Sequence, residues 1–147
     1  MAPVTGILNN QEYEALMNYY MATILATTFD EAIERTEAAL KTEGFGVLTR
    51  VDIQKTLKAK IDVDFRPYTI LGACNPALAH EALQLEDKVG TMLPCNVVVQ
   101  QMSDGKVEVA AINPLASMQA IDNPQLKQAA AVVRDKLSKV IETLASA

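Results

Sequence analysis

The order of apolar and polar residues along the chain predicts alternating strands and helices. Residues 20–27 have strand composition, and Thr28 precedes Glu31 at the spacing of a helix-capping box. Apolar residues then recur every three or four positions up to Gly44, a residue type that commonly ends a helix. We therefore expect a first strand followed by an amphipathic helix that packs on a sheet.

The same alternation continues through the middle of the chain. The next predicted elements are a strand at 45–51, a short polar helix at 52–60, a strand at 68–74 and a helix at 76–85. Asn75 and Pro76 support the last helix, because asparagine is favoured at the N-cap and proline at the first helical position. Cys74 is therefore expected to lie directly before a helix N-terminus.

A hairpin follows, and the length of its loop sets its register. With a three-residue loop at 103–105, Val99 pairs with Val109, which makes one face of the hairpin apolar and the other polar. Cys95 continues the apolar row. We therefore expect its side chain to point toward the core or toward a pocket beneath the sheet.

The end of the chain predicts a long helix. Asn123 and Pro124 repeat the cap-and-proline start, and an apolar stripe then continues to Leu144. The whole order predicts one α+β domain over residues 20–147, with a mainly antiparallel sheet packed by an N-terminal helix and a long C-terminal helix. Residues 1–19 lack a strong apolar face and are expected to form a flexible or partner-dependent extension.

Composition narrows the classes of function. The chain has 147 residues, half of them apolar, which suits a single core. Its net charge is -5 and no Lys or Arg precedes Arg35, so we expect no nucleic-acid partner. A basic signal region and an apolar run of about 20 residues are both absent, which predicts a cytoplasmic protein without a membrane partner. Thiols in that compartment are normally reduced.

The two cysteines are the first candidates for chemistry. Each is followed by asparagine, in Cys74-Asn75 and Cys95-Asn96. A thiol before a helix N-terminus lies near the positive end of the helix dipole, which favours the thiolate. If their strands are neighbours, Cys95 is placed to act as a resolving thiol for Cys74. The alternative is that both are small buried apolar residues, which is the commoner role of free cysteine.

Two further interpretations involve other side chains. Cys74, His80 and Cys95 are suitable ligands for Zn, Cu or Fe, but they fall short of four ligands and match no standard zinc spacing. His80 is also expected on the solvent side of its helix or at a dimer contact. Arg66 beside Tyr68 suits a small anion, although pairing with a nearby acidic residue is the simpler account.

Three stretches, at 43–48, 65–76 and 93–99, carry a family resemblance. Over about residues 20–145 the chain resembles the domain-of-unknown-function family 302, and the two Cys-Asn motifs are specific to that family. The resemblance implies an α+β fold similar to TATA-binding-protein-like folds and a homodimer, with no assigned reaction. The chain departs from the family at Asp62, where glycine is common.

Together these patterns favour a non-catalytic homodimer that binds a small ligand or a partner, with a pocket near the two Cys-Asn motifs. The alternative is a thiol-redox or sulfur-handling protein, or a metal- or haem-binding one, that uses Cys74 and Cys95. No cofactor is specified by the sequence, and enzyme activity is left open. Hydrolysis ranks last, because the chain has one histidine and no nucleophile elbow, Walker loop or dinucleotide fingerprint.

Overall fold

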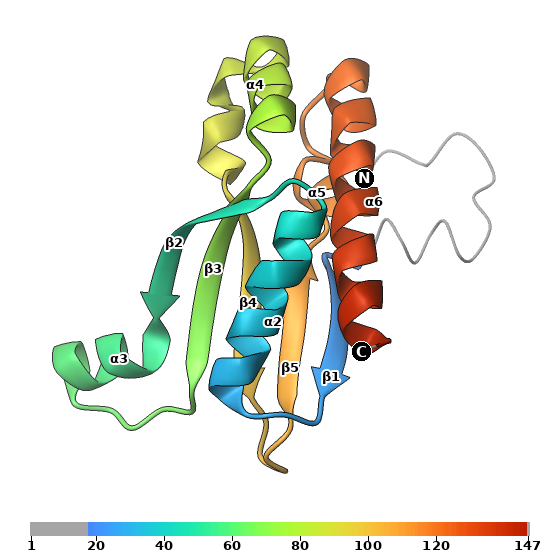
Figure 1. Ribbon diagram of the computed structural model, residues 1–147. Coiled ribbons are helices and arrows are strands. Elements are labelled where there is room, and N and C mark those ends of the chain that lie inside the picture. Colours follow the sequence, from blue (N-terminus) through green and yellow to red (C-terminus); the bar gives the residue numbers. More distant parts are fainter. Residues whose placement is uncertain (1–17, 147) are drawn as a thin grey trace.

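The protein is built on a five-stranded antiparallel sheet, seen in a computed structural model that describes residues 18–146 (Figure 1). In chain order the elements are β1 (Tyr20–Leu25), α2 (Phe29–Thr42), β2 (Gly46–Asp52), α3 (Ile53–Ile61), β3 (Tyr68–Cys74), α4 (Pro76–Leu85), the 3-10 helix η1 (Asp87–Met92), β4 (Cys95–Gln101), β5 (Val107–Ile112), α5 (Pro114–Ser117) and α6 (Pro124–Ala145). The strand order is β1-β5-β4-β3-β2. The predicted α+β class and antiparallel sheet are confirmed.

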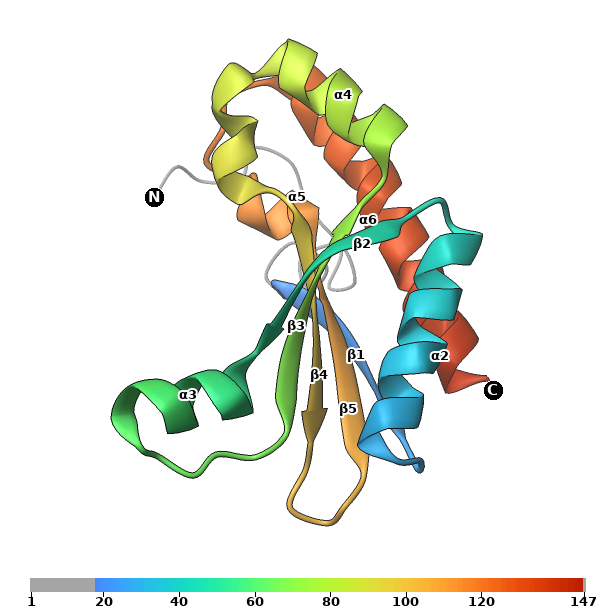
Figure 2. The ribbon, with the colours of Figure 1, turned by 60° about the vertical axis from the view of Figure 1, so that its left-hand side comes forward.

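Helices α2 and α6 pack together over one face of this sheet, as expected of the N-terminal and C-terminal helices (Figure 2). Alternate side chains of the central strands point toward them and are fully buried, including Leu71, Val97, Val99 and Val109. An ion pair between Arg50 of β2 and Glu37 of α2 lies at the edge of this layer. We call this side of the sheet the covered face.

The hairpin of β4 and β5 has the predicted register, with Val99 opposite Val109. Gly105 has φ +85°, the left-handed conformation expected of the loop glycine. The second face is less polar than expected. Val98 pairs with Ala110 there, so that face is apolar at its centre and polar only toward its ends.

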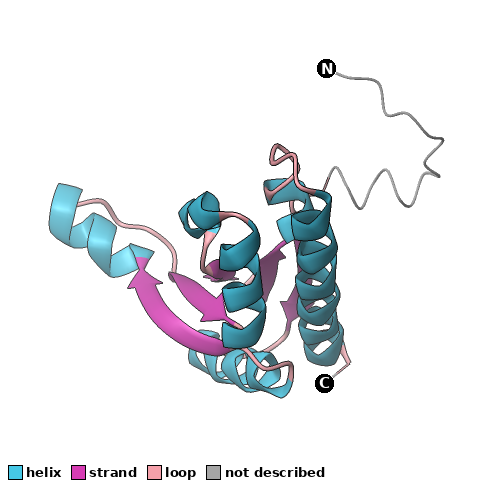
Figure 3. Cartoon of the chain, turned by 90° about the horizontal axis from the view of Figure 1, so that it is seen from above, coloured by secondary structure: helices cyan, strands magenta, loops and turns pink. Residues whose placement is uncertain are grey.

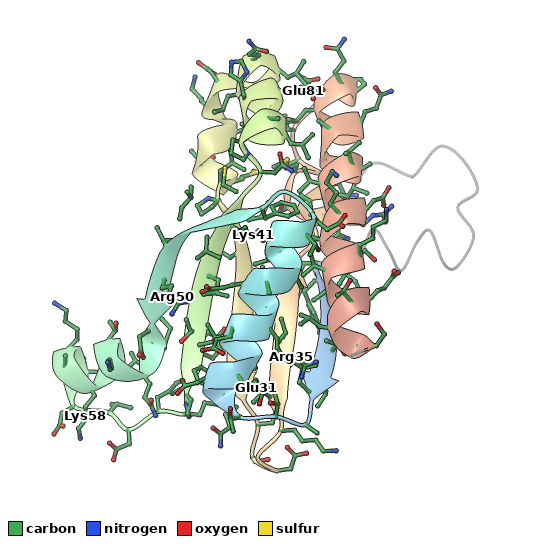
Figure 4. The ribbon with its side chains drawn as sticks, viewed as in Figure 1. Glu31, Arg35, Lys41, Arg50, Lys58 and Glu81 are labelled. Atoms are coloured by element: carbon green, nitrogen blue, oxygen red, sulfur yellow. The ribbon has the colours of Figure 1, made fainter. Side chains whose placement is uncertain are left out.

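Helix α3 forms an arm that stands apart from the other helices (Figure 3). None of its residues is buried. Lys58, on the outer part of the arm, pairs with Asp62 at 2.9 Å and Asp64 at 3.2 Å (Figure 4). Asp62 has φ +54°, which explains why a glycine suits this position.

Helix α6 is the longest helix in the described chain, with 22 residues. Its apolar side, with Leu126, Leu137 and Leu144, is buried, whereas Lys127, Asp135 and other polar residues face away. Within residues 18–146 no helix combines the length and apolar character needed to cross a bilayer.

Some expectations need correction. β1 ends at Leu25 rather than at residue 27, and η1 was not predicted. The loop expected after Ile112 contains α5, because Asn113 accepts a hydrogen bond from the Leu115 amide and begins a helix. Of the expected extension at residues 1–19, only Asn18 and Tyr19 fall within the described residues.

Candidate functional site

A cavity of about 40 Å³ lies between α4 and α6, where β3 ends and β4 begins. Its walls come from both helices, from the two strand ends and from α5. The lining residues are Phe45, Ala73, Cys74, Asn75, Leu78, Ala79, Ala82, Leu93, Pro94, Cys95, Pro114, Met118, Leu126, Ala129, Ala130 and Val133. Apart from one amide and two thiols the lining is apolar, so the cavity favours an apolar occupant.

Both cysteines line this cavity. β3 and β4 are antiparallel neighbours with Ala73 opposite Cys95, which brings the end of one strand beside the start of the other. Cys74 is half-buried and Cys95 is buried, and both thiols are free. The structure thus places the two thiols at one end of the sheet, around a shared space.

Burial controls the ionisation of Cys95. Desolvation by burial, together with a smaller effect from the charge of nearby Cys74, raises the pKa of its thiol from 9.0 to about 11. Cys95 is therefore protonated at neutral pH. Because the thiolate is the reactive form, Cys95 is a poor nucleophile in this state.

The asparagines of the two motifs have different positions. Asn75 Oδ1 accepts a hydrogen bond from the Leu78 amide at 3.3 Å and caps α4, as predicted. Its Nδ2 donates to the Glu43 carbonyl at 3.3 Å and ties α4 to the end of α2. Asn96 instead lies exposed on the opposite face of the sheet from the cavity.

The close approach of β2, β3 and β4 at this site depends on Gly72. A Cβ atom on Gly72 would overlap the Thr49 hydroxyl and lie 2.8 Å from Pro94 Cγ. Pro94 follows a cis peptide bond from Leu93 and directly precedes Cys95. The absence of a side chain at Gly72 therefore leaves room for Thr49 and for Pro94, the residue before Cys95.

His80 is exposed on α4 and does not line the cavity. Across residues 18–146, the structure contains no group of three His, Cys, Asp or Glu side chains able to hold a metal ion. A metal bound by Cys74 and Cys95 would therefore need other ligands than the His, Asp and Glu side chains of residues 18–146.

Arg66 and Tyr68 lie toward the other end of the sheet. Arg66 Nε donates to Gln100 Oε1 at 2.9 Å, and the guanidinium lies 4.4 Å from the Phe65 ring centroid and 5.5 Å from that of Tyr68. Arg66 thus contacts an amide and two aromatic rings. The sequence had suggested an acidic residue as its partner. These residues are not part of the cavity.

Sequence reasoning missed the helical walls of the site. Small residues at neighbouring turns of α4, Ala79 and Ala82, face Ala129 and Ala130 of α6 across the cavity. Alanines that recur at helical spacing on two helices are a usable signal for a narrow space between them. Sequence alone did not show that α4 and α6 are neighbours.

Comparison with known proteins gives the family. The model of the family described as "Domain of unknown function DUF302" matches residues 21–144. The chain belongs to the DUF302 family. A crystal structure of an uncharacterized conserved DUF302 protein from Bacillus stearothermophilus has a TM-score of 0.79 and 34% identity, covering 84% of this chain and 96% of that one. Among curated proteins none matches.

Proposed function

We propose that this DUF302 protein is a non-catalytic homodimeric binding protein that takes a small apolar group into the cavity between α4 and α6. The observation that carries the proposal is the lining, which is apolar and includes a protonated thiol, Cys95. The polar atoms of Asn75 are already engaged with Leu78 and Glu43. Few free donors or acceptors therefore remain to hold a polar ligand.

The size of the cavity limits the occupant. A volume of about 40 Å³ exceeds the roughly 10–15 Å³ needed for one water, but falls well below the roughly 150 Å³ of a cavity that holds benzene. An apolar group of a few atoms fits, such as the end of an alkyl chain. A larger ligand requires α4 to move, and α4 has a single buried residue, Ala82, to hold it in place.

Xenon under pressure is a suitable probe, because it is apolar and about the size of the space. In the unaltered protein we expect xenon to shift the amide NMR signals of residues around the cavity. Ala79→Val should reduce xenon affinity at least tenfold, since two added carbons occupy the cavity. Ala77→Val is the matched control, on the same helix but exposed and outside the lining.

The two variants separate a cavity effect from a helix effect. Both introduce the same β-branched residue into α4, so any loss of helix stability is shared. Xenon shifts that are absent from the unaltered protein, or that persist unchanged in Ala79→Val, would contradict binding in this cavity.

A dithiol role is the second candidate, because Cys74 is close enough to affect the pKa of Cys95. Thiolate at Cys74 would attack an external disulfide and release one thiolate. Cys95 would then lose its proton and displace the second, which leaves a Cys74–Cys95 disulfide and the external disulfide reduced. Incubation with oxidised glutathione followed by mass spectrometry tests this role. A loss of two hydrogens is expected, whereas two unreacted thiols or a stable mixed disulfide would exclude it.

A further inference from the structure

The face of the sheet opposite α2 and α6 is open along the lengths of its strands in the described part of the chain, and α3 projects to one side of it (Figure 2). We call it the open face. One row of paired residues on it is apolar from one edge of the sheet to the other: Ala22, Ala110, Val98, Ile70 and Val51. Three tyrosines, Tyr19, Tyr20 and Tyr68, line a hollow of about 310 Å³ beside this row.

We infer that the open face is the surface on which a second copy of this chain docks, with the two sheets face to face. The inference rests on the homodimer in the proposed function and names its interface. Face-to-face packing of sheets about 10 Å apart is a common way to bury apolar strand residues. A twofold dimer uses the same patch on both copies, so one apolar face is sufficient.

The size of the open face suits a dimer. Five strands at a spacing of about 4.8 Å, each roughly 20 Å long, give a footprint of about 480 Å². With the relief that side chains add to it, this footprint is of the same order as the roughly 800 Å² per partner that a stable complex buries.

The charge distribution also suits a second copy. Each chain carries a net charge of -5, so two copies repel unless they meet where charge is low or balanced. On the open face the carboxylate of Glu108 accepts from Gln100 Nε2 at 3.1 Å, and Gln100 in turn accepts from Arg66. One acidic and one basic side chain are thus linked through an amide, and the central row is uncharged.

Glutamate substitutions at two edges of the open face test the inference. Ile24 is 49% exposed on β1 and Val51 is 42% exposed on β2, so neither is needed for the core. The matched control is Val132→Glu on α6, at a position 46% exposed but away from this face. Light scattering after size-exclusion chromatography gives the mass of each full-length variant.

We expect the unaltered chain at about 32 kDa, twice its mass of 15.9 kDa. Ile24→Glu with Val51→Glu should raise the dimer dissociation constant about a hundredfold or more, because carboxylates would lose water without gaining partners. Val132→Glu should remain a dimer. The chain has four tyrosines and no tryptophan, so acrylamide quenching of tyrosine fluorescence should increase when the dimer is diluted.

Two results would overturn the inference. A monomeric unaltered chain would leave the open face to another partner or to residues 1–17. A dimer that withstands both glutamates would place the interface elsewhere. Neither result depends on xenon binding, so failure of the dimer surface and failure of the cavity are distinguishable.

Discussion

The two faces of the sheet show how the same strands serve different purposes. On β3, Leu71 points to the covered face and is fully buried, whereas its neighbour Ile70 points to the open face and is half-buried. On β4, Val97 and Val98 differ in the same way. Apolar residues on both faces therefore do not mean that both faces belong to the core of one chain. Comparing them separates what folds the monomer from what is available to a partner.

The largest expected effect comes from Leu71. Leu71→Ala should lower the free energy of unfolding by about 3 kcal/mol, because it leaves a cavity under α2 and α6. Ile70→Ala should cost less than about 1 kcal/mol when measured in urea at low protein concentration. Equal losses would show that the open face is as important to the folded monomer as the covered face.

The second effect is the pH dependence of the free energy of unfolding that Cys95, on the covered face, contributes. The pKa of its thiol is 9.0 in the unfolded chain and about 11 in the folded protein. Because the thiolate forms more readily in the unfolded chain, ionisation favours unfolding. The stabilisation is complete below pH 9 and is lost as the pH rises to about 11, with a size of up to about 2.7 kcal/mol. Urea titrations from pH 8.5 to 11 measure it. Cys95→Ala should lack this loss and Cys74→Ala should largely retain it, whereas parallel curves for all three proteins would contradict the raised pKa.

A smaller effect tests the close approach at Gly72. Gly72→Ala should cost about 2 kcal/mol, since its Cβ would meet Thr49 and Pro94. Gly46→Ala, on the adjacent strand, should change stability by less than about 0.5 kcal/mol because nothing lies within 4 Å of its Cβ position. Thermal unfolding of the two variants gives the comparison, and similar melting temperatures would rule out a packing role specific to Gly72.

The smallest effects separate the two Cys-Asn motifs. Asn75→Ala should lower the free energy of unfolding by about 1 kcal/mol, because α4 loses its cap. Asn96→Ala should have an effect close to zero in the monomer, as the side chain is exposed. Chemical denaturation of the two variants gives the comparison. An equal loss of unfolding free energy would mean that Asn96 stabilises the fold as much as Asn75 does, despite its exposed position.

Local signals predicted much of this fold. The register of the hairpin followed from the spacing of Val99 and Val109 around a three-residue loop, and α4 followed from Asn75 and Pro76. Such features depend on a few consecutive residues and their backbone preferences. They could therefore be predicted without knowledge of which elements pack together.

The cavity and the open face were harder to predict from the sequence. Ala79 and Ala129 are fifty positions apart, and only the packing of α4 on α6 makes them opposite walls. The polar residues Gln100 and Glu108 suggested a solvated face, although Val98 and Ala110 form an apolar pair on the same face of the same two strands. Both features depend on long-range neighbours, which sequence periodicity does not specify.

The three Asn-Pro pairs have a consequence for the chemical ageing of the protein. Asn75, Asn113 and Asn123 each cap a helix and also donate to a distant carbonyl, of Glu43, Asn18 and Leu85 respectively. Spontaneous deamidation requires the backbone nitrogen of the following residue to attack the asparagine side chain, and proline has no N–H with which to do so. The side chains that join these distant segments are therefore protected from the reaction that most often damages asparagine.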